Sequence, residues 1–244
     1  MASTVKVYRE QPSLNIDGET INTRGGRYGE LYTVPIYPAR SAIADEGAYF
    51  TVKNPTSGTG IATIAAATSD SALETYILMR NNAVAGQRRA YLDYLKLHCT
   101  AAGVGHTSSR YTMTIDNGVA RYTSGAAMTA IPTNVNMDSG EASICTCIAG
   151  PLITTAATSA ARRVAHGVIR AAVINVVGDA HVFVFGGGGS CAYRGVAEGT
   201  TQMFSVIPAP PIVVGPQQSF LFSVWGASMS TGISFEIEMG WWER

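Results

Sequence analysis

Ile233-Ser-Phe-Glu-Ile-Glu-Met-Gly-Trp-Trp242, near the end of the chain, alternates between large apolar residues and polar or small ones over ten positions. Successive side chains of a β-strand point to opposite faces, so this alternation is typical of a strand with one buried face. The face expected to be buried carries Ile233, Phe235, Ile237, Met239 and Trp241.

The stretch before it, residues 219–225, alternates as well, with Phe220, Phe222 and Val224 on one face. A loop of small residues, 226–232, separates the two stretches, and such loops commonly join antiparallel neighbours. The two stretches are therefore predicted to form a β-hairpin. Four prolines upstream exclude a helix there and favour an extended chain: Pro208, Pro210, Pro211 and Pro216.

Short alternating or apolar segments, separated by turn residues, recur through the rest of the chain. The segments around 70–82 and 88–99 also fit a helical pattern, but their aromatic and apolar content favours strands. Asp116-Asn-Gly118 predicts a hairpin turn between strands at 109–116 and 119–122. Other strands are expected at 31–37, 48–53, 60–67, 144–149, 164–174, 181–185, 203–207 and 212–214.

This pattern predicts an all-β fold, a jelly-roll-like antiparallel β-sandwich that forms a single domain over residues 29–244. Residues 1–28 contain few large apolar groups and several glycines, and are predicted to form an extended N-terminal arm. Two alternatives remain for the arm: it is disordered, or it becomes ordered on a neighbouring subunit.

The surface is expected to be poor in charge, because only 14% of the residues are charged and the formal net charge is zero. A typical soluble domain has about 25% charged residues. This composition favours a subunit covered by neighbours, or a surface coated with small polar residues. Nucleic-acid binding is not expected, because it requires a basic surface.

No apolar run approaches the ~20 residues that a membrane-spanning helix requires. The first residues lack the apolar core of a secretory signal, so synthesis in the cytoplasm without a signal peptide is expected. Four cysteines in a chain of this length do not indicate a disulfide framework. Cys145 and Cys147 share a strand face, and buried free thiols are expected.

Motifs with catalytic potential are weak. Gly186–Gly189 lacks the lysine and helix of a phosphate-binding loop, and Ser190 lacks the context of a nucleophile elbow. Glu236 and Glu238 share a strand face about 7 Å apart, a separation that can serve glycoside hydrolysis, but a solvated or interface face explains them as well. Asp179 and His181 share a face without a third partner. No enzyme, metal site or cofactor is predicted.

Five stretches together resemble a family of bacteriophage virion structural proteins. The stretches are spread over about four-fifths of the chain, and the resemblance is carried by turns and strand cores rather than by catalytic motifs. It implies a capsid decoration (cement) protein, a jelly-roll-like homotrimer that bridges major capsid subunits on the virion surface. The stretches are Ala48–Ala62, Arg89–Leu97, Gly178–Gly186, Pro210–Phe222 and Phe235–Arg244.

Besides a hydrolase that uses Glu236 and Glu238, two functions are weighed. The first is an oligomeric cement protein of a phage capsid. The alternative is a tail or fibre module that recognises host-surface glycans, in which Trp225, Trp242 and Tyr193 stack on sugar rings. The residues predicted to lie at an oligomer or capsid interface are Arg24, Arg27, Tyr28, Trp225, Trp242, Glu243 and Arg244.

Overall fold

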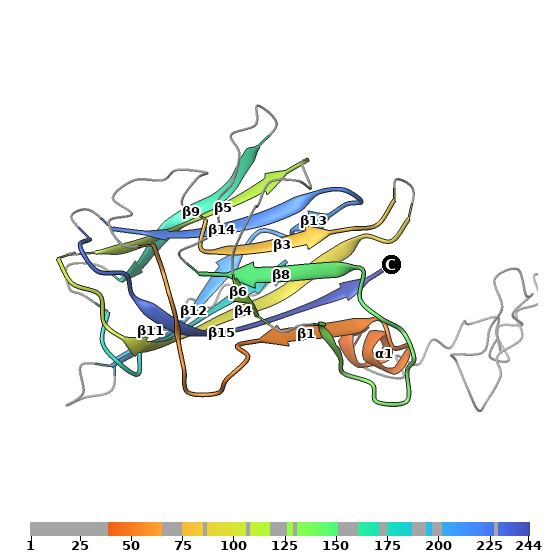
Figure 1. Cartoon of the computed structure of the whole chain (residues 1–244), viewed down its shortest axis with the longest axis horizontal. Coiled ribbons are helices and arrows are strands. Elements are labelled where there is room, and N and C mark those ends of the chain that lie inside the picture. Colours follow the sequence, from red (N-terminus) through yellow and green to blue (C-terminus); the bar gives the residue numbers. More distant parts are fainter. Residues whose placement is uncertain are drawn as a thin grey trace, which may run out of the picture.

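Two β-sheets face each other across a shared apolar interior (Figure 1). The computed structural model describes residues 39–64, 75–84, 87–105, 108–117, 126–128, 131–150, 161–170, 175–186, 194–196, 202–226 and 229–244. The predicted all-β sandwich is confirmed. The predicted arm, residues 1–28, lies outside the described residues.

The larger sheet has nine strands, and its pairs are antiparallel except for one. The exception is the parallel pair β10–β12, in which His181 lies opposite Ser205. Two short strands add to its sides: β13 (Val213–Val214) pairs with β4, and β2 (Ile61–Ala62) pairs with β15. The main order is β11 (Arg194–Val196), β12 (Met203–Ala209), β10 (Ala180–Phe185), β4 (Ala90–Ala101), β15 (Ser234–Glu243), β1 (Tyr49–Lys53) and β7 (Thr133–Asn134).

The smaller sheet has six antiparallel strands. Its order is β6 (Ala126–Ala127), β8 (Cys145–Ala149), β3 (Ile77–Asn81), β14 (Ser219–Trp225), β5 (Ser109–Asp116) and β9 (Arg162–Arg170). Among the described residues, the two segments that also fitted a helical pattern contain strands β3 and β4. Both carry apolar rows that the sandwich buries.

The predicted hairpin between 219–225 and 233–242 is wrong. Both segments are strands, but β14 pairs with β3 and β5 in the smaller sheet, whereas β15 pairs with β1 and β4 in the larger one. Each strand carries a row of apolar side chains that must be buried against another part of the chain. The apolar side chains of both strands belong to one cluster between the sheets. Residues 226–232 therefore connect the two layers of the sandwich (Figure 1).

The hairpin predicted at Asp116–Gly118 is also wrong, because β14 and β9 occupy both sides of β5 over nearly its whole length. Turn residues favour a reversal of the chain, but they do not select the strand that comes to lie alongside. The segment predicted to return, 119–122, lies outside the described residues.

Aromatic rings connect the two sheets at the centre of the core. Phe183 of β10 packs edge-on against Tyr111 of β5 and Phe222 of β14, with ring centroids 4.8 and 5.1 Å apart. Phe185 meets Phe220 in the same way at 6.0 Å. Edge-to-face pairs of this kind add to the stabilisation from burial alone, so the central strands of the two sheets are tied together here.

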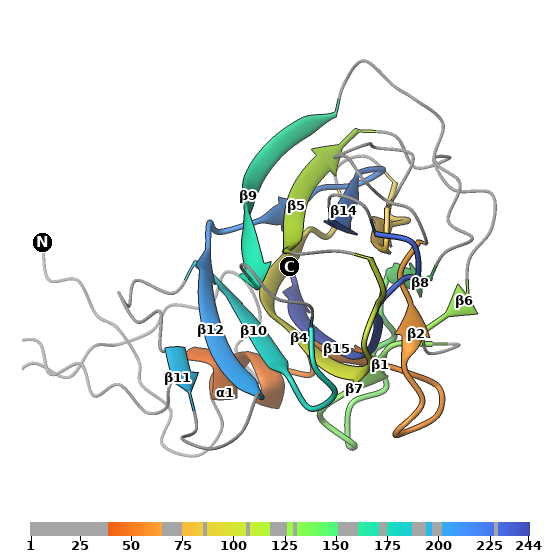
Figure 2. The same ribbon diagram turned by 90° about the vertical axis from the view of Figure 1, so that its left-hand side faces the viewer.

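The sequence predicted strands from residue 30 onward and missed the helix α1 (Ala39–Asp45). Three of its seven residues are alanine, the residue with the highest helix propensity. Gly47 adopts a φ of +71° just after the helix, a conformation that glycine provides readily at helix ends. Figure 2 shows α1 beside the larger sheet. The neighbouring prediction of a strand at 31–37 lies outside the described residues.

The prediction of buried free thiols is confirmed for Cys99, Cys145 and Cys147. Burial raises the pKa of the Cys99 thiol to about 11, with a further contribution from the negative charge of Asp179. These thiols are therefore protonated and unreactive at neutral pH. Cys191 lies outside the described residues.

Candidate functional site

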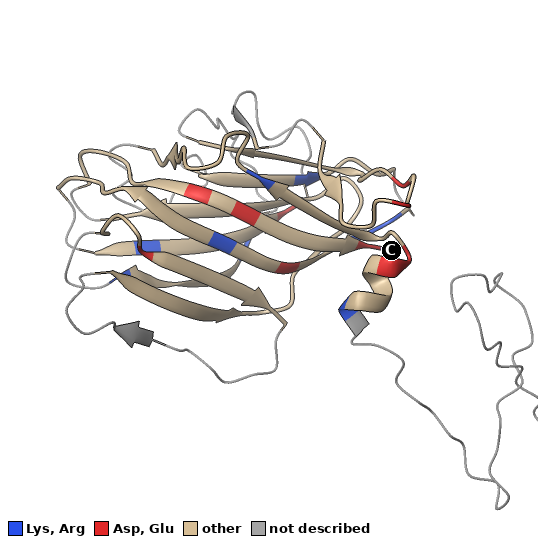
Figure 3. Cartoon of the chain, turned by 90° about the horizontal axis from the view of Figure 1, so that it is seen from below, with Lys and Arg blue, Asp and Glu red and all other residues tan. Residues whose placement is uncertain are grey.

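One accessible surface is the side of the nine-stranded sheet that faces away from the smaller sheet, which we call the outer face. Strand alternation places its residues: His181 and Phe183 of β10 point into the core, so Val182 and Val184 point outward. Figure 3 shows charged residues of both signs lying across neighbouring strands on this side. The outer face has a charged half, on β4 and β15, and an apolar half, on β10 and β12.

In the charged half, both predicted carboxylates have partners within the chain. The Tyr94 hydroxyl donates a 2.6 Å hydrogen bond to Glu238, and Lys96 Nζ lies 3.6 Å from the same carboxylate. Glu236 accepts a hydrogen bond from the Gly58 N–H at 3.1 Å and lies 3.8 Å from His98 Nδ1. The two carboxylates share a face as predicted, but each is held by its own neighbours.

The apolar half is formed by strand positions that alternate with buried ones. Phe204 of β12 is 47% exposed, and Val206 lies opposite Val182 of β10, which in turn lies opposite Lys96. An apolar patch with charged residues beside it is typical of a protein–protein interface. The residues of this apolar half are Val182, Val184, Phe204, Val206 and Pro208.

The three predicted interface residues at the end of the chain have different environments. Trp242 stacks on Tyr91, with centroids 5.6 Å apart and rings 3° from parallel, and is partly exposed. Arg244 is exposed and its Nη2 lies 3.0 Å from the Glu46 carboxylate. Both can still meet a partner on the outer face or at its edge.

Glu243 does not lie at an accessible surface, so its assignment to an interface is wrong. It is 3% exposed, and its carboxylate accepts hydrogen bonds from the Ser143 hydroxyl at 2.5 Å, the Ile144 N–H at 3.1 Å and the Trp241 indole N–H at 3.0 Å. It follows Trp241 by two residues and so shares its inward face. The buried indole needs an acceptor, and Glu243 provides it.

Trp225 lies in the other sheet, at the end of β14, and is not brought together with Trp242. Its indole N–H donates to the Thr112 hydroxyl at 3.2 Å, and the Arg110 guanidinium lies 5.4 Å from the ring centroid. The remaining predicted interface residues, Arg24, Arg27 and Tyr28, lie outside the described residues, as does Tyr193.

A buried polar network around Asp179 was only partly anticipated. Asp179 is fully buried, forms an ion pair with Arg170 of β9, and accepts hydrogen bonds from the backbone N–H groups of Val176 at 2.8 Å and Met203 at 2.7 Å. The shared face of Asp179 and His181 was visible in the sequence. Arg170 was not, because only the approach of the two sheets brings it there.

His181 lies beside a serine and an amide, an arrangement that resembles those of nucleophilic enzymes. Its Nδ1 is 2.7 Å from Ser205 Oγ, and its Nε2 is 3.3 Å from the amide nitrogen of Asn175. The Asn175 carbonyl oxygen accepts from the Ser109 hydroxyl at 2.6 Å, which orients its NH₂ group toward the histidine. Nε2 is therefore the acceptor, and the imidazole proton lies on Nδ1.

This tautomer directs the histidine proton toward Ser205, so the histidine does not act as a base on that hydroxyl. Burial lowers the pKa of His181 to about 4, which keeps the ring neutral. His181 is fully buried and Ser205 is 7% exposed. The network therefore satisfies polar groups inside the sandwich and stabilises the contact between β9, β10 and β12.

His181 gives a testable pH dependence of stability. Its pKa rises from about 4 in the folded chain toward 6.5 on unfolding, so the unfolded state binds the extra proton and stability falls as pH drops from 6.5 to 4. Between pH 7 and pH 4 this histidine should cost roughly 2–3 kcal/mol. Urea unfolding of the wild type and of His181→Gln across this range should show a shallower pH slope for the variant. Equal slopes would contradict the assignment.

Within the described part of the chain, no cluster of three or more histidine, cysteine or acidic side chains is arranged to hold a metal ion. The same residues include no helix with the length and apolarity needed to cross a membrane. No protein-family model matches the chain, and the searches of curated proteins and of solved structures found no similar protein. The resemblance to phage virion proteins therefore stays a prediction.

Proposed function

We propose that this chain is a structural subunit of a bacteriophage virion, which assembles as a homotrimer and binds the major capsid protein as a cement. The observation that carries the proposal is the outer face of the nine-stranded sheet. Its apolar half is open to solvent at Phe204 and is flanked by a charged half that can orient a partner.

The proposed mechanism is burial of surface area. The chain has no net charge to keep copies apart, and only 14% of its residues are charged. Contact across a sheet face removes apolar area from water, which stabilises the complex by about 25 cal/mol per Å² before the cost of association. A trimer that contacts several capsid subunits at once would gain further by avidity.

The effect of Phe204→Asp tests this surface. The substitution places a charge in the apolar half of the outer face, two positions before Val206 on β12, and we expect it to weaken self-association by at least about tenfold, as for a residue buried in an interface. Sedimentation equilibrium of wild type and variant measures the effect. Met137→Asp is the matched control, because Met137 is 98% exposed and follows β7, which lies at the opposite edge of the sheet from β12.

Three results would overturn the proposal. The first is a wild-type chain that sediments as a monomer at tens of micromolar. The second is equal loss of association in both variants. The third is the absence of the protein from purified virions, as judged by mass spectrometry and electron cryomicroscopy of intact particles. Density on the head surface together with a loss specific to Phe204→Asp would support it.

A further inference from the structure

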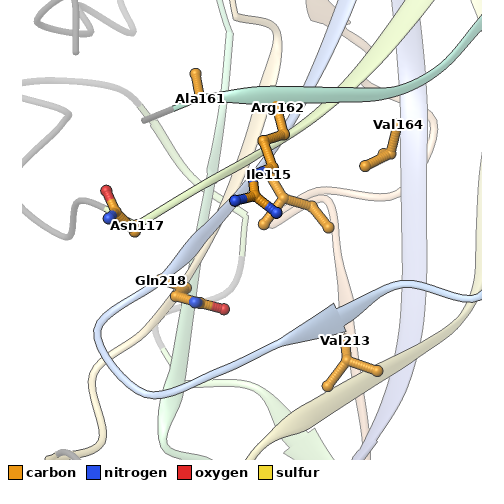
Figure 4. Close-up of a pocket in the computed structure, with 7 residues that line it drawn as sticks. All are labelled: Ile115, Asn117, Ala161, Arg162, Val164, Val213 and Gln218. Atoms are coloured by element: carbon orange, nitrogen blue, oxygen red, sulfur yellow. The ribbon is translucent and has the colours of Figure 1, made fainter. Parts of the chain in front are cut away.

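A pocket of about 560 Å³ lies where the two sheets approach each other at one side of the sandwich (Figure 4). Ile115 of β5 and Arg162 and Val164 of β9 come from the smaller sheet, whereas Val213 of β13 comes from the larger one. This volume is in the range of small-molecule binding sites. Val164 and Val213 are each more than a third exposed, so the pocket is open to solvent.

Arg162 gives the pocket a positive charge that no carboxylate among the described residues balances. Its side chain extends from β9 across Ile115 (Figure 4), and no Asp or Glu lines the pocket. Among the described residues it has no carboxylate within ion-pair distance, in contrast to the arginines at 40, 88, 170 and 244, which all have one. A guanidinium left open beside apolar side chains is suited to bind a planar anion with two hydrogen bonds.

Two side-chain amides add hydrogen-bond donors. The Gln218 carbonyl oxygen accepts from the Gly215 N–H at 2.8 Å, which leaves its NH₂ group to donate to a ligand. The neighbouring Gln217 adopts a φ of +60° in this turn. Its side-chain amide donates a 2.8 Å hydrogen bond to the Ala83 carbonyl, which fixes the turn that carries Gln218. Asn117 contributes the second amide to the lining of the pocket.

We propose that this pocket binds a carboxylate carried on an aliphatic stem. The guanidinium of Arg162 would take the carboxylate, with the amide of Gln218 as an additional donor, and the side chains of Ile115, Val164 and Val213 would cover the stem. A phosphate or sulfate would leave the three aliphatic side chains uncovered, and a neutral apolar molecule would leave the arginine unpaired. This binding site is independent of the virion proposal.

Hexanoate is the probe for this site. Titration into ¹⁵N-labelled full-length protein should give saturable shifts at the amides of residues lining the pocket, whereas the neutral isostere hexanamide should bind at least about tenfold more weakly, because a charge-assisted pair is lost. Arg162→Gln should weaken hexanoate binding by a similar factor. Arg163→Gln is the matched control, since it removes the same charge from the next position of β9 without touching the pocket.

The carboxylate has two possible sources, a free acid or a glutamate side chain of another protein, and a second probe separates them. N-acetyl-glutamate N-methylamide presents the same carboxylate between two peptide groups. Tighter binding of hexanoate would indicate that the natural ligand is a free aliphatic acid. Tighter binding of the blocked glutamate would indicate that it is a glutamate side chain of another protein. Absence of saturable shifts with both probes, or equal weakening in Arg162→Gln and Arg163→Gln, would overturn the proposal.

Discussion

Asp179→Ala is expected to lower the free energy of unfolding by about 3–5 kcal/mol, the usual cost of removing one partner of a buried ion pair. Asp179 is fully buried, and its loss removes the carboxylate that pairs with the Arg170 guanidinium in the interior. It also leaves the N–H groups of Val176 and Met203 without their acceptor. Equilibrium unfolding in urea measures the change.

An exposed ion pair provides the comparison. Glu141 pairs with Arg88 at 2.7 Å, and the two side chains are 54% and 44% exposed, so Glu141→Ala should cost less than about 1 kcal/mol. Combining Asp179→Ala with Arg170→Met should recover part of the lost stability, because the buried positive charge disappears while the two N–H groups stay unsatisfied. Equal effects of Asp179→Ala and Glu141→Ala would show that burial does not govern the strength of this pair.

Trp241→Ala should also cost about 3–5 kcal/mol, as expected for the removal of a large aromatic side chain from a packed core. Trp241 is fully buried, lies with its ring centroid 6.4 Å from that of Phe50, and donates its indole N–H to Glu243. The substitution opens a cavity at the end of β15 and removes one of the hydrogen bonds of a buried carboxylate. Thermal and urea unfolding report the loss.

The adjacent Trp242→Ala is the natural control. Trp242 faces outward and stacks on Tyr91 with its ring partly exposed, so its truncation should cost only about 1 kcal/mol. The contrast between two neighbouring tryptophans tests the inward and outward assignment of β15 directly. A larger effect at position 242 than at 241 would reverse that assignment.

Local pattern accounts for most of the strands. The alternation in 233–242 placed five apolar residues correctly in the core, and the strands of 48–53, 88–99 and 109–116 followed from the same reasoning. The helix α1 was missed because seven residues contain too few turns for a clear helical period. Both predicted hairpins were wrong, because a turn signal does not specify the neighbouring strand.

The predicted interface residues were likewise placed correctly only in part. Trp242 and Arg244 lie on accessible surface, but Glu243 shares the inward face of Trp241. Its assignment to an interface was wrong, although its position two residues after Trp241 already indicated the inward face. Asp179 and His181 were recognised as sharing a face, yet the residues that complete their network come from strands β9 and β12. No sequence motif marked Arg162 as a binding residue, because the pocket around it forms only where β13 approaches β9.

The positions of most strands and of their apolar faces can be read from the amino-acid sequence, since alternation of side chains depends only on residues two positions apart. The placement of β14 and β15 in opposite sheets, and the contact of Arg170 with Asp179, depend instead on how the whole chain packs. The physical reason is that apolar rows are chemically alike: the row of Phe220 and Phe222 can be covered by any complementary row. The partner is selected by the packing of the whole sandwich at once.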